Sequence, residues 1–223
     1  MKILGINGSP RKEASNTRKL VRSVFDGAAE LGAETELIDI ADQTIAFCSG
    51  CLTCYKTGSC IFDDDAQKIF ALMQEADGIV LGSPVYILSI TGQLKQFLDR
   101  LTDGIHCQML SGKYGCSVVT TGGSADQEVL TYMNRTLNMF GVTVVGGERV
   151  AMASGPEAFK EAVVDSRALG RNLAEAITMK RRYPEQEAVL ASLQKHFCQF
   201  AEMAKETYPH QYDFWLAKGE IHR

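Results

Sequence analysis

Two spacings of apolar residues alternate along the chain. Short apolar runs of strand length are separated by segments in which apolar residues recur every three or four positions. The runs predicted as strands are residues 1–6, 34–40, 78–82, 116–121 and 142–145, and the helical segments begin at about 16, 66, 92, 127 and 156. Strands that alternate with helices predict right-handed crossovers and a doubly wound parallel sheet covered on both faces, an α/β fold.

The pattern changes after residue 180. A break at 181–184 is followed by an apolar stripe at helical spacing, and the last sixteen residues include the only tryptophan, Trp215. We therefore expect an α/β domain over residues 1–180 and a helical, aromatic-rich C-terminal extension over 181–223. An extension this aromatic is expected to dock, either on its own domain or on a partner subunit.

Composition narrows the class of protein. The net charge of −4 gives no basic face for nucleic acid, and no apolar run approaches the ~20 residues that span a membrane. Met1 leads at once into a strand pattern, so no signal peptide is expected. The seven cysteines are then expected to be reduced thiols or metal ligands, and the protein to be soluble and cytoplasmic.

The loop after the first predicted strand is suited to an anion. A parallel sheet binds ligands beyond the carboxyl ends of its strands, and here the loop leads into a helix N-terminus with free N–H groups. The loop lacks the G-x-G-x-x-G of dinucleotide sites and the Gly-Lys-Ser/Thr of a Walker A motif. Its polar residues suit a phosphate monoester, although a turn that only caps the helix would look the same. The residues expected to hold the phosphate are Ser9, Arg11, Ser15, Asn16 and Thr17.

Two later loops narrow the ligand. The loop at 83–90 places apolar and aromatic side chains at the end of a buried strand, where a flat ring would cover them. The loop at 121–126 offers glycines, which let the backbone approach a ligand edge. A phosphate in the first loop and a ring between the other two predict a mononucleotide flavin, FMN. The expected ring contacts are Ser83, Pro84, Val85, Tyr86 and Ile87 on one side and Thr121, Gly122 and Gly123 on the other.

The loop at 45–64 carries four cysteines in the spacing C-x2-C-x2-C-x5-C: Cys48, Cys51, Cys54 and Cys60. The first three match the spacing that wraps a [4Fe–4S] cubane in bacterial ferredoxins, and Gly58 lets the chain turn back so that Cys60 completes the same cluster. Alternatives are tetrahedral zinc, thiols that only pack the loop, and a C-x-x-C redox pair. No helical pattern begins at Cys51 to lower its pKa, which counts against the redox pair. Cys107, Cys116 and Cys198 are expected to be isolated thiols.

Three motifs in order resemble the NAD(P)H-dependent FMN reductase family of the flavodoxin-like superfamily. They are GSPRKEASNT after the first strand, SPVY with GQLKQFLDR after the third, and TTGG after the fourth. The resemblance covers about residues 1–180 and implies a five-stranded sheet of order 2-1-3-4-5 with FMN at the switch point, held by the loop residues named above. The cysteine spacing is similar to that of the iron–sulfur flavoproteins, a branch with FMN and a [4Fe–4S] cluster. The family usually forms homodimers or homotetramers.

The resemblance leaves three functions open. The first is an FMN oxidoreductase that passes electrons between a reduced donor (NAD(P)H or ferredoxin) and a small-molecule or redox-protein acceptor through FMN and a [4Fe–4S] cluster. The second is a cluster-free NAD(P)H-dependent reductase of flavin, quinones or nitro compounds. The third is a non-catalytic flavin- or zinc-binding module whose tail binds a partner. No acid–base residue is assigned, and His106 is expected to be incidental.

Overall fold

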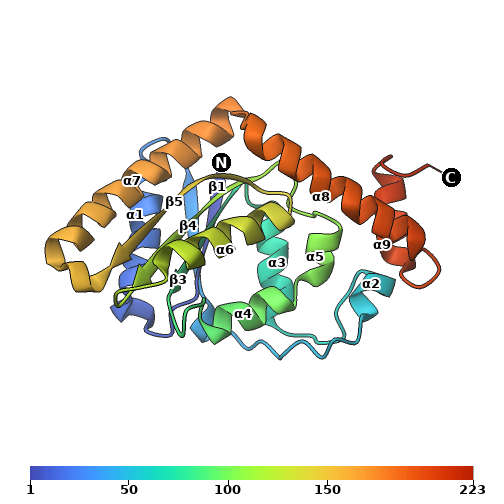
Figure 1. The fold of residues 1–223 in the computed structure, drawn as a ribbon, viewed down its shortest axis with the longest axis horizontal. Helices are drawn as coiled ribbons and strands as arrows, with labels where there is room; N and C mark the ends of the chain where they lie inside the picture. The colour runs from blue at the N-terminus through green and yellow to red at the C-terminus, as the bar shows by residue number, and fades with distance from the viewer. Residues whose placement is uncertain (223) are drawn as a thin grey trace.

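A computed structural model describes residues 1–222. Its centre is a five-stranded, all-parallel sheet in the order β2-β1-β3-β4-β5, so the predicted flavodoxin-like fold is confirmed (Figure 1). The strands are β1 (Lys2–Asn7), β2 (Glu34–Asp39), β3 (Gly78–Pro84), β4 (Tyr114–Thr121) and β5 (Thr143–Ala151). The edge strand β5 is longer than expected, because the chain passes through an irregularity at Gly146 and then pairs with β4 again up to Ala151.

Helices cover both faces of the sheet, as expected for a parallel sheet buried on both sides. One face packs against α1 (Asn16–Ala29) and α7 (Pro156–Met179), and the other against α3 (Asp65–Glu75), α4 (Gly92–Asp99) and α6 (Asp126–Met139). Alternate residues of the strands serve the two cores: in β1, Ile3 faces α1, whereas Leu4 and Ile6 face the opposite layer. Two short helices, α2 (Thr53–Thr57) and α5 (Thr102–His106), lie beside the sheet (Figure 1).

The helices α1 and α7 cross in backbone contact at two glycines. A Cβ atom on Gly27 would lie 1.9 Å from the carbonyl oxygen of Arg167, and a Cβ on Gly170 would lie 1.9 Å from that of Val24. Only hydrogen fits between the helices at these positions, so the two glycines set how closely α7 lies on α1. Because the N-terminus of α1 lies at the first loop, this crossing also fixes the direction in which α1 points toward that loop.

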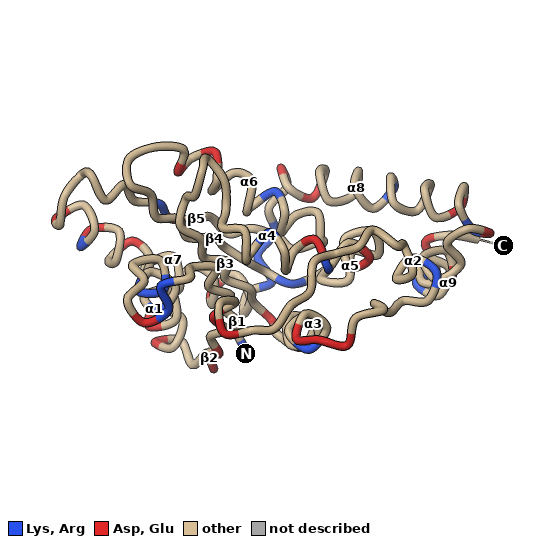
Figure 2. Tube along the Cα trace, turned by 90° about the horizontal axis from the view of Figure 1, so that it is seen from below, with Lys and Arg blue, Asp and Glu red and all other residues tan. Residues whose placement is uncertain are grey.

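The C-terminal extension consists of α8 (Pro184–Met203) and α9 (Pro209–Ala217). Figure 2 shows α8 running away from the sheet and bringing α9 beside α2 and α5. Near the start of α8, the side-chain amide of Gln186 pairs with the backbone of Val144 on the edge strand β5, as a further strand would. The amide oxygen accepts from Val144 N at 2.9 Å, and the amide nitrogen donates to Val144 O at 2.7 Å. The extension thus docks on its own chain at both ends. Within residues 1–222, no helix combines the length and the apolar character needed to cross a bilayer.

Candidate flavin and cysteine sites

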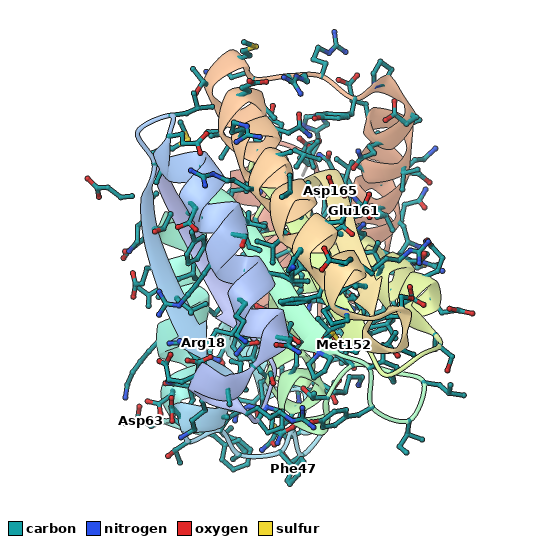
Figure 3. All side chains as sticks on the ribbon, turned by 90° about the vertical axis from the view of Figure 1, so that its left-hand side faces the viewer. Arg18, Phe47, Asp63, Met152, Glu161 and Asp165 are labelled. Atoms are coloured by element: carbon teal, nitrogen blue, oxygen red, sulfur yellow. The ribbon has the colours of Figure 1, made fainter. Side chains whose placement is uncertain are left out.

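The three predicted loops meet in one cleft at the carboxyl end of the sheet. The cleft has a volume of about 220 Å³ and opens to solvent. Figure 3 shows Arg18 and Met152 at this end of the molecule. The lining residues are Ser9, Arg11, Ser15, Asn16, Thr17, Pro84, Val85, Tyr86, Thr120, Thr121, Gly122 and Met152. All five residues expected to hold a phosphate therefore lie together, beside most of those expected to contact a ring.

The first loop is built around the N-terminus of α1. Ser15 is the N-cap residue, and its hydroxyl accepts a hydrogen bond from Arg18 N at 3.1 Å. Asn16 and Thr17 follow in the first turn, where the backbone N–H groups have no partner within the helix. The helix dipole and these N–H groups favour an anion at this end of the cleft. Arg11, whose side chain is exposed, adds a full positive charge at the rim.

A buried ion pair holds this loop on the sheet. Arg18 Nε donates to Asp39 Oδ2 at 2.9 Å, and Asn7 Nδ2 donates to Asp39 Oδ1 at 2.6 Å. Asp39 ends β2 and Asn7 ends β1, so the carboxylate joins two strand ends to the first turn of α1. Since Arg18 is committed to Asp39 and Glu13, Arg11 is the cationic side chain that lines the cleft.

The second loop turns back sharply after Tyr86. Tyr86 and Ser89 exchange both backbone hydrogen bonds, and the two residues between them, Ile87 and Leu88, have φ angles of 47° and 61°. These left-handed values are costly for a β-branched residue such as Ile87. Ile87 is 97% exposed and Leu88 72% exposed, so the strained turn holds two apolar side chains in solvent at the mouth of the cleft.

Three residues expected at the flavin lie outside the cleft lining. Ser83 is fully buried, and its hydroxyl accepts from Thr91 N at 3.1 Å, while Thr91 Oγ1 donates to Gly8 O at 2.6 Å. Ser83 therefore ties the second loop to the first. Ile87 points into solvent, and Gly123 lies beyond Gly122 on the third loop.

Two lining residues were missing from the sequence analysis. Thr120 lies one residue before the third loop, and its hydroxyl is 2.6 Å from that of Thr17. Met152 follows the end of β5, and its sulfur lies 3.7 Å from Asn16 Nδ2. The rule that ligands bind beyond the carboxyl ends of strands would have included Met152 if the end of the fifth strand had been placed correctly.

The four cysteines of the second site line a single cavity. This cavity has a volume of about 100 Å³ and opens to solvent; the four cysteines, Cys48, Cys51, Cys54 and Cys60, line it together with Leu52, Tyr55, Phe62 and Arg100. Figure 3 places Phe47, which precedes this cavity in the chain and is 77% exposed, at the outer edge of the molecule. All seven cysteines of the chain are free thiols.

The prediction that no helix begins near Cys51 is wrong. The short helix α2 starts at Thr53, after Leu52 in a left-handed conformation, and ends at Gly58. Hydrogen bonds from the side chain and backbone of Thr53, together with Ser49, lower the pKa of the exposed Cys51 to about 7. Burial, followed by the charge of Asp103, raises the pKa of Cys54 to about 11. One thiol is thus poised to ionise at neutral pH, while another needs a cation or metal to do so.

Arg100 supplies a cation at this site. Its side chain is fully buried; one terminal nitrogen donates to Cys60 Sγ at 3.1 Å, and the other donates to Asp64 Oδ2 at 2.6 Å and Ala46 O at 2.9 Å. The guanidinium also lies over the ring of Phe62, with its carbon 4.8 Å from the ring centroid. Arg100 Nε has no hydrogen-bond partner among residues 1–222. Positive charge and N–H donors next to thiolates suit an anionic thiolate–metal centre.

The C-terminal extension closes the side of this cavity. Tyr55 of α2 packs edge-on against Tyr208, and its ring centroid lies 4.6 Å from that of His106 at a tilt of 35°. His106 in turn contacts Phe197 and Phe200 of α8. His106 also lies within hydrogen-bond distance of Tyr55 Oη (3.1 Å) and Gln211 Oε1 (3.3 Å). His106 is therefore a packing residue between the cysteine loop and the tail, away from the flavin cleft.

Comparisons with known proteins agree with this architecture. An iron–sulfur flavoprotein of Archaeoglobus fulgidus is 35% identical over 222 residues, 99% of this chain and 100% of that protein. Another, of Methanocaldococcus jannaschii, is 29% identical over 92% of this chain and 98% of that protein. Among solved structures, a flavone reductase superimposes with a TM-score of 0.66 at 23% identity, covering 80% of this chain and 63% of that one.

A solved NAD(P)H:quinone oxidoreductase from Methanothermobacter marburgensis gives a TM-score of 0.62 at 15% identity, over 82% of this chain and 98% of that one. At these identities the structural matches show the fold. The family described as NADPH-dependent FMN reductase matches residues 1–157, which carry the whole flavin cleft. The chain therefore belongs to the NADPH-dependent FMN reductase family and is a flavin-dependent oxidoreductase.

Proposed function

We propose that this protein is an FMN oxidoreductase that also carries a [4Fe–4S] cluster on Cys48, Cys51, Cys54 and Cys60. It would pass electrons between a reduced donor, NAD(P)H or ferredoxin, and a small-molecule or redox-protein acceptor. The observation that carries the proposal is the cavity lined by all four cysteines and held against the fully buried cation of Arg100. Similarity over its whole length to proteins named iron–sulfur flavoproteins supports it.

The cleft suits FMN at both ends. Hydroxyls, a helix N-terminus and Arg11 meet the phosphate, while Pro84, Val85 and Tyr86 offer an apolar wall to the ring. Bound FMN takes a hydride as two electrons and can return them singly, and a cluster exchanges single electrons. The protein residues hold and orient these groups: the first loop fixes the phosphate, and Arg100 balances the charge of the thiolates.

The cysteine cavity also suits a cluster. Leu52, Tyr55 and Phe62 give the cavity an apolar lining beside the sulfurs, although Cys48 and Cys51 are exposed to solvent. Four cysteines around one such cavity suit the ligation of a cubane. The opposing thiol pKa values of Cys51 and Cys54 fit a site that is completed only when a metal centre binds. These features favour a cluster over thiols that merely pack the loop.

The test is metal and sulfide analysis of anaerobically purified protein. We expect about four iron and four sulfide per chain with one FMN, and a broad visible band near ~400 nm that reductant bleaches. Replacing the four loop cysteines with serine removes iron and sulfide but leaves FMN bound. Iron and sulfide below one per chain in the wild-type protein would overturn the cluster.

The family description itself favours a second candidate, a cluster-free NAD(P)H-dependent flavin or quinone reductase. It predicts NAD(P)H oxidation that is unchanged in the four-serine variant. The cluster proposal instead predicts that electron transfer to a one-electron acceptor such as ferredoxin is lost in that variant, while FMN remains. Family membership already favours either enzyme over a non-catalytic module.

The remaining parts of the proposal concern organisation. We propose that residues 1–180 form the FMN domain and 181–223 an extension that steadies the cysteine loop, which is supported by its own apolar cluster of Phe197, Ala201, Trp215 and Ile221. The exposed Ile87 and Leu88 at the mouth of the cleft support a homodimer or homotetramer. Seven free thiols suit the cytoplasm, where thiols stay reduced.

A further inference from the structure

Three side chains of types that can bind a metal lie together next to the cysteine loop, outside the linings of the two sites described above. Asp103 and Cys107 lie four positions apart at α5, and His210 comes from α9 in the C-terminal extension. Each offers one donor atom, and the three atoms lie within 4.8 Å of one another. Cys107 is fully buried and Asp103 nearly so. Cys107, expected to be an isolated thiol, thus lies beside two other side chains that can bind a metal.

We propose that Asp103, Cys107 and His210 form a zinc site that fastens the C-terminal extension to α5. Asp103 and His210 face one another in the interior. His210 Nε2 lies 3.2 Å from Asp103 Oδ2, an ion-pair distance, but the two atoms do not meet in hydrogen-bond geometry, and neither has a hydrogen-bond partner elsewhere among residues 1–222. Asp103 Oδ1 accepts a hydrogen bond from Gln211 Nε2 at 3.0 Å. A buried oxygen and nitrogen that lie this close without a hydrogen bond suit a cation held between them.

The donor set matches zinc in type and in spacing. Carboxylate, thiolate and imidazole are all common zinc ligands, and a tetrahedral ion would separate their donor atoms by about 3.3–3.6 Å. The three donor atoms lie within 4.8 Å of one another, so the side chains need to close by about 1–1.5 Å to reach this spacing. One carboxylate and one thiolate neutralise the ion, which removes the cost of a net buried charge. Water fills the fourth position.

The surroundings hold the ligands as a zinc site requires. Gln211 orients the carboxylate of Asp103, and Gln211 Oε1 in turn lies 3.3 Å from His106 Nδ1. The ring of His210 packs on Gly58 so closely that a Cβ there would lie 2.6 Å from His210 Cε1. Ordered neighbours of this kind fix ligand orientation and raise metal affinity. A zinc ion here would join α5, α9 and the cysteine loop.

The first test is zinc analysis of the full-length protein by mass spectrometry, with iron counted separately. We expect one zinc per chain in the wild-type protein and in the four-serine variant of the cysteine loop. Zinc falls below about 0.2 per chain in Cys107→Ser and His210→Gln, each with normal FMN content. The matched controls Cys116→Ser and His196→Gln keep their zinc. Unchanged zinc in Cys107→Ser, or loss of zinc only in the four-serine variant, overturns the proposal.

The second test leaves Asp103, Cys107 and His210 unchanged. Cobalt(II) added to the zinc-depleted four-serine protein should give an intense thiolate-to-cobalt absorption at one equivalent, since Cys107 is then its thiolate ligand. Removing the metal should shift the emission of Trp215, which is 1% exposed and bonded to His106 O, to longer wavelength. If cobalt binds without a thiolate absorption band, or if the emission wavelength of Trp215 is the same with and without the metal, Asp103 and His210 form only an ion pair.

Discussion

Arg100 donates a hydrogen bond to the sulfur of Cys60 at 3.1 Å from a fully buried guanidinium. A cation and an N–H donor at a ligating sulfur stabilise the reduced, more negative form of a cluster. For the proposed cluster, we expect Arg100→Gln to lower the midpoint potential by about 59 mV, a tenfold shift for one electron. Arg100→Lys keeps the positive charge but not the planar guanidinium with its several N–H donors. Its midpoint potential should lie between those of the wild-type protein and Arg100→Gln. Redox titration followed by EPR measures both.

The matched control for Arg100 is Lys160→Gln, because Lys160 forms an exposed ion pair with Glu157 on α7, at the opposite face of the sheet. Its cluster potential should equal that of the wild-type protein. A potential unchanged in Arg100→Gln, with iron content retained, would show that the bond to Cys60 has no part in tuning the centre.

Arg11 is the cation that lines the phosphate end of the flavin cleft, whereas its neighbour Lys12 pairs with Asp42. We expect Arg11→Gln to weaken FMN binding about tenfold, or ~1.4 kcal/mol, a modest loss because the side chain is exposed. Lys12→Gln should leave the Kd unchanged. Riboflavin, which lacks the phosphate, should bind both variants as it binds the wild-type protein; flavin fluorescence quenching measures each Kd. Equal losses for FMN and riboflavin would contradict a phosphate contact.

The glycine at 170 allows a clear test of the α1–α7 crossing. Alanine is the better helix former by ~1 kcal/mol, but its Cβ would lie 1.9 Å from Val24 O. Separating two packed helices costs ~1–3 kcal/mol or more, so steric repulsion outweighs propensity. We expect Gly170→Ala to reduce the free energy of unfolding by about 2 kcal/mol in urea melts. At Gly92, where a Cβ would meet no described heavy atom within 4 Å, alanine should be neutral or stabilising.

The stability of the protein should fall as the pH drops below about 6.5, in part because of His106. Burial lowers the pKa of His106 from its ordinary value of 6.5. The unfolded chain then binds a proton that the folded chain does not, so acid favours unfolding until the pH is below both pKa values. His106→Phe keeps the aromatic packing and should flatten this part of the stability profile. His196→Gln should retain it, and parallel profiles for wild type and His106→Phe would count against the assignment.

The turn at Ile87 and Leu88 provides a test of oligomerisation that spares the fold. Both residues have positive φ angles, which Asn-Gly adopts with less strain, so Ile87→Asn with Leu88→Gly should keep the turn. The same change removes two apolar side chains from the surface. If this surface is the subunit interface, the mass measured by light scattering falls to that of a monomer while FMN binding persists. An unchanged oligomer would place the interface elsewhere.

The sheet and the start of α1 in the first loop were predictable from the sequence because each rests on local signals. Buried strands such as 78–82 are continuous apolar runs, and Ser15 is a strong N-cap residue at the start of an apolar periodicity. The end of β5 was not predictable, because Gly146 and Gly147 look like a turn. In the structure Gly146 lies at a register shift and the strand continues, which carries Met152 to the cleft.

The surroundings of the cysteine site depend on contacts between residues far apart in the sequence, which local sequence patterns do not reveal. The helix α2 has only five residues, too few for a periodicity, and it starts from a left-handed Leu52. The contact of Arg100 with Cys60 joins positions forty residues apart, and that of His210 with Asp103 spans more than a hundred. Tertiary packing alone brings these residues together, so the spacing of the cysteines predicted a metal centre but not its surroundings.

The docking of α9 on the cysteine loop also orders events during synthesis. At ~5–20 residues per second, the ribosome completes α9 roughly 10–30 s after Cys60 has emerged. Until then, Tyr55 lacks the contact that Tyr208 later provides. The nascent chain thus has an interval in which a donor of the proposed cluster could reach the loop before α9 packs beside it. Loading during translation would need no unfolding, whereas repair of a damaged centre would first require the tail to detach.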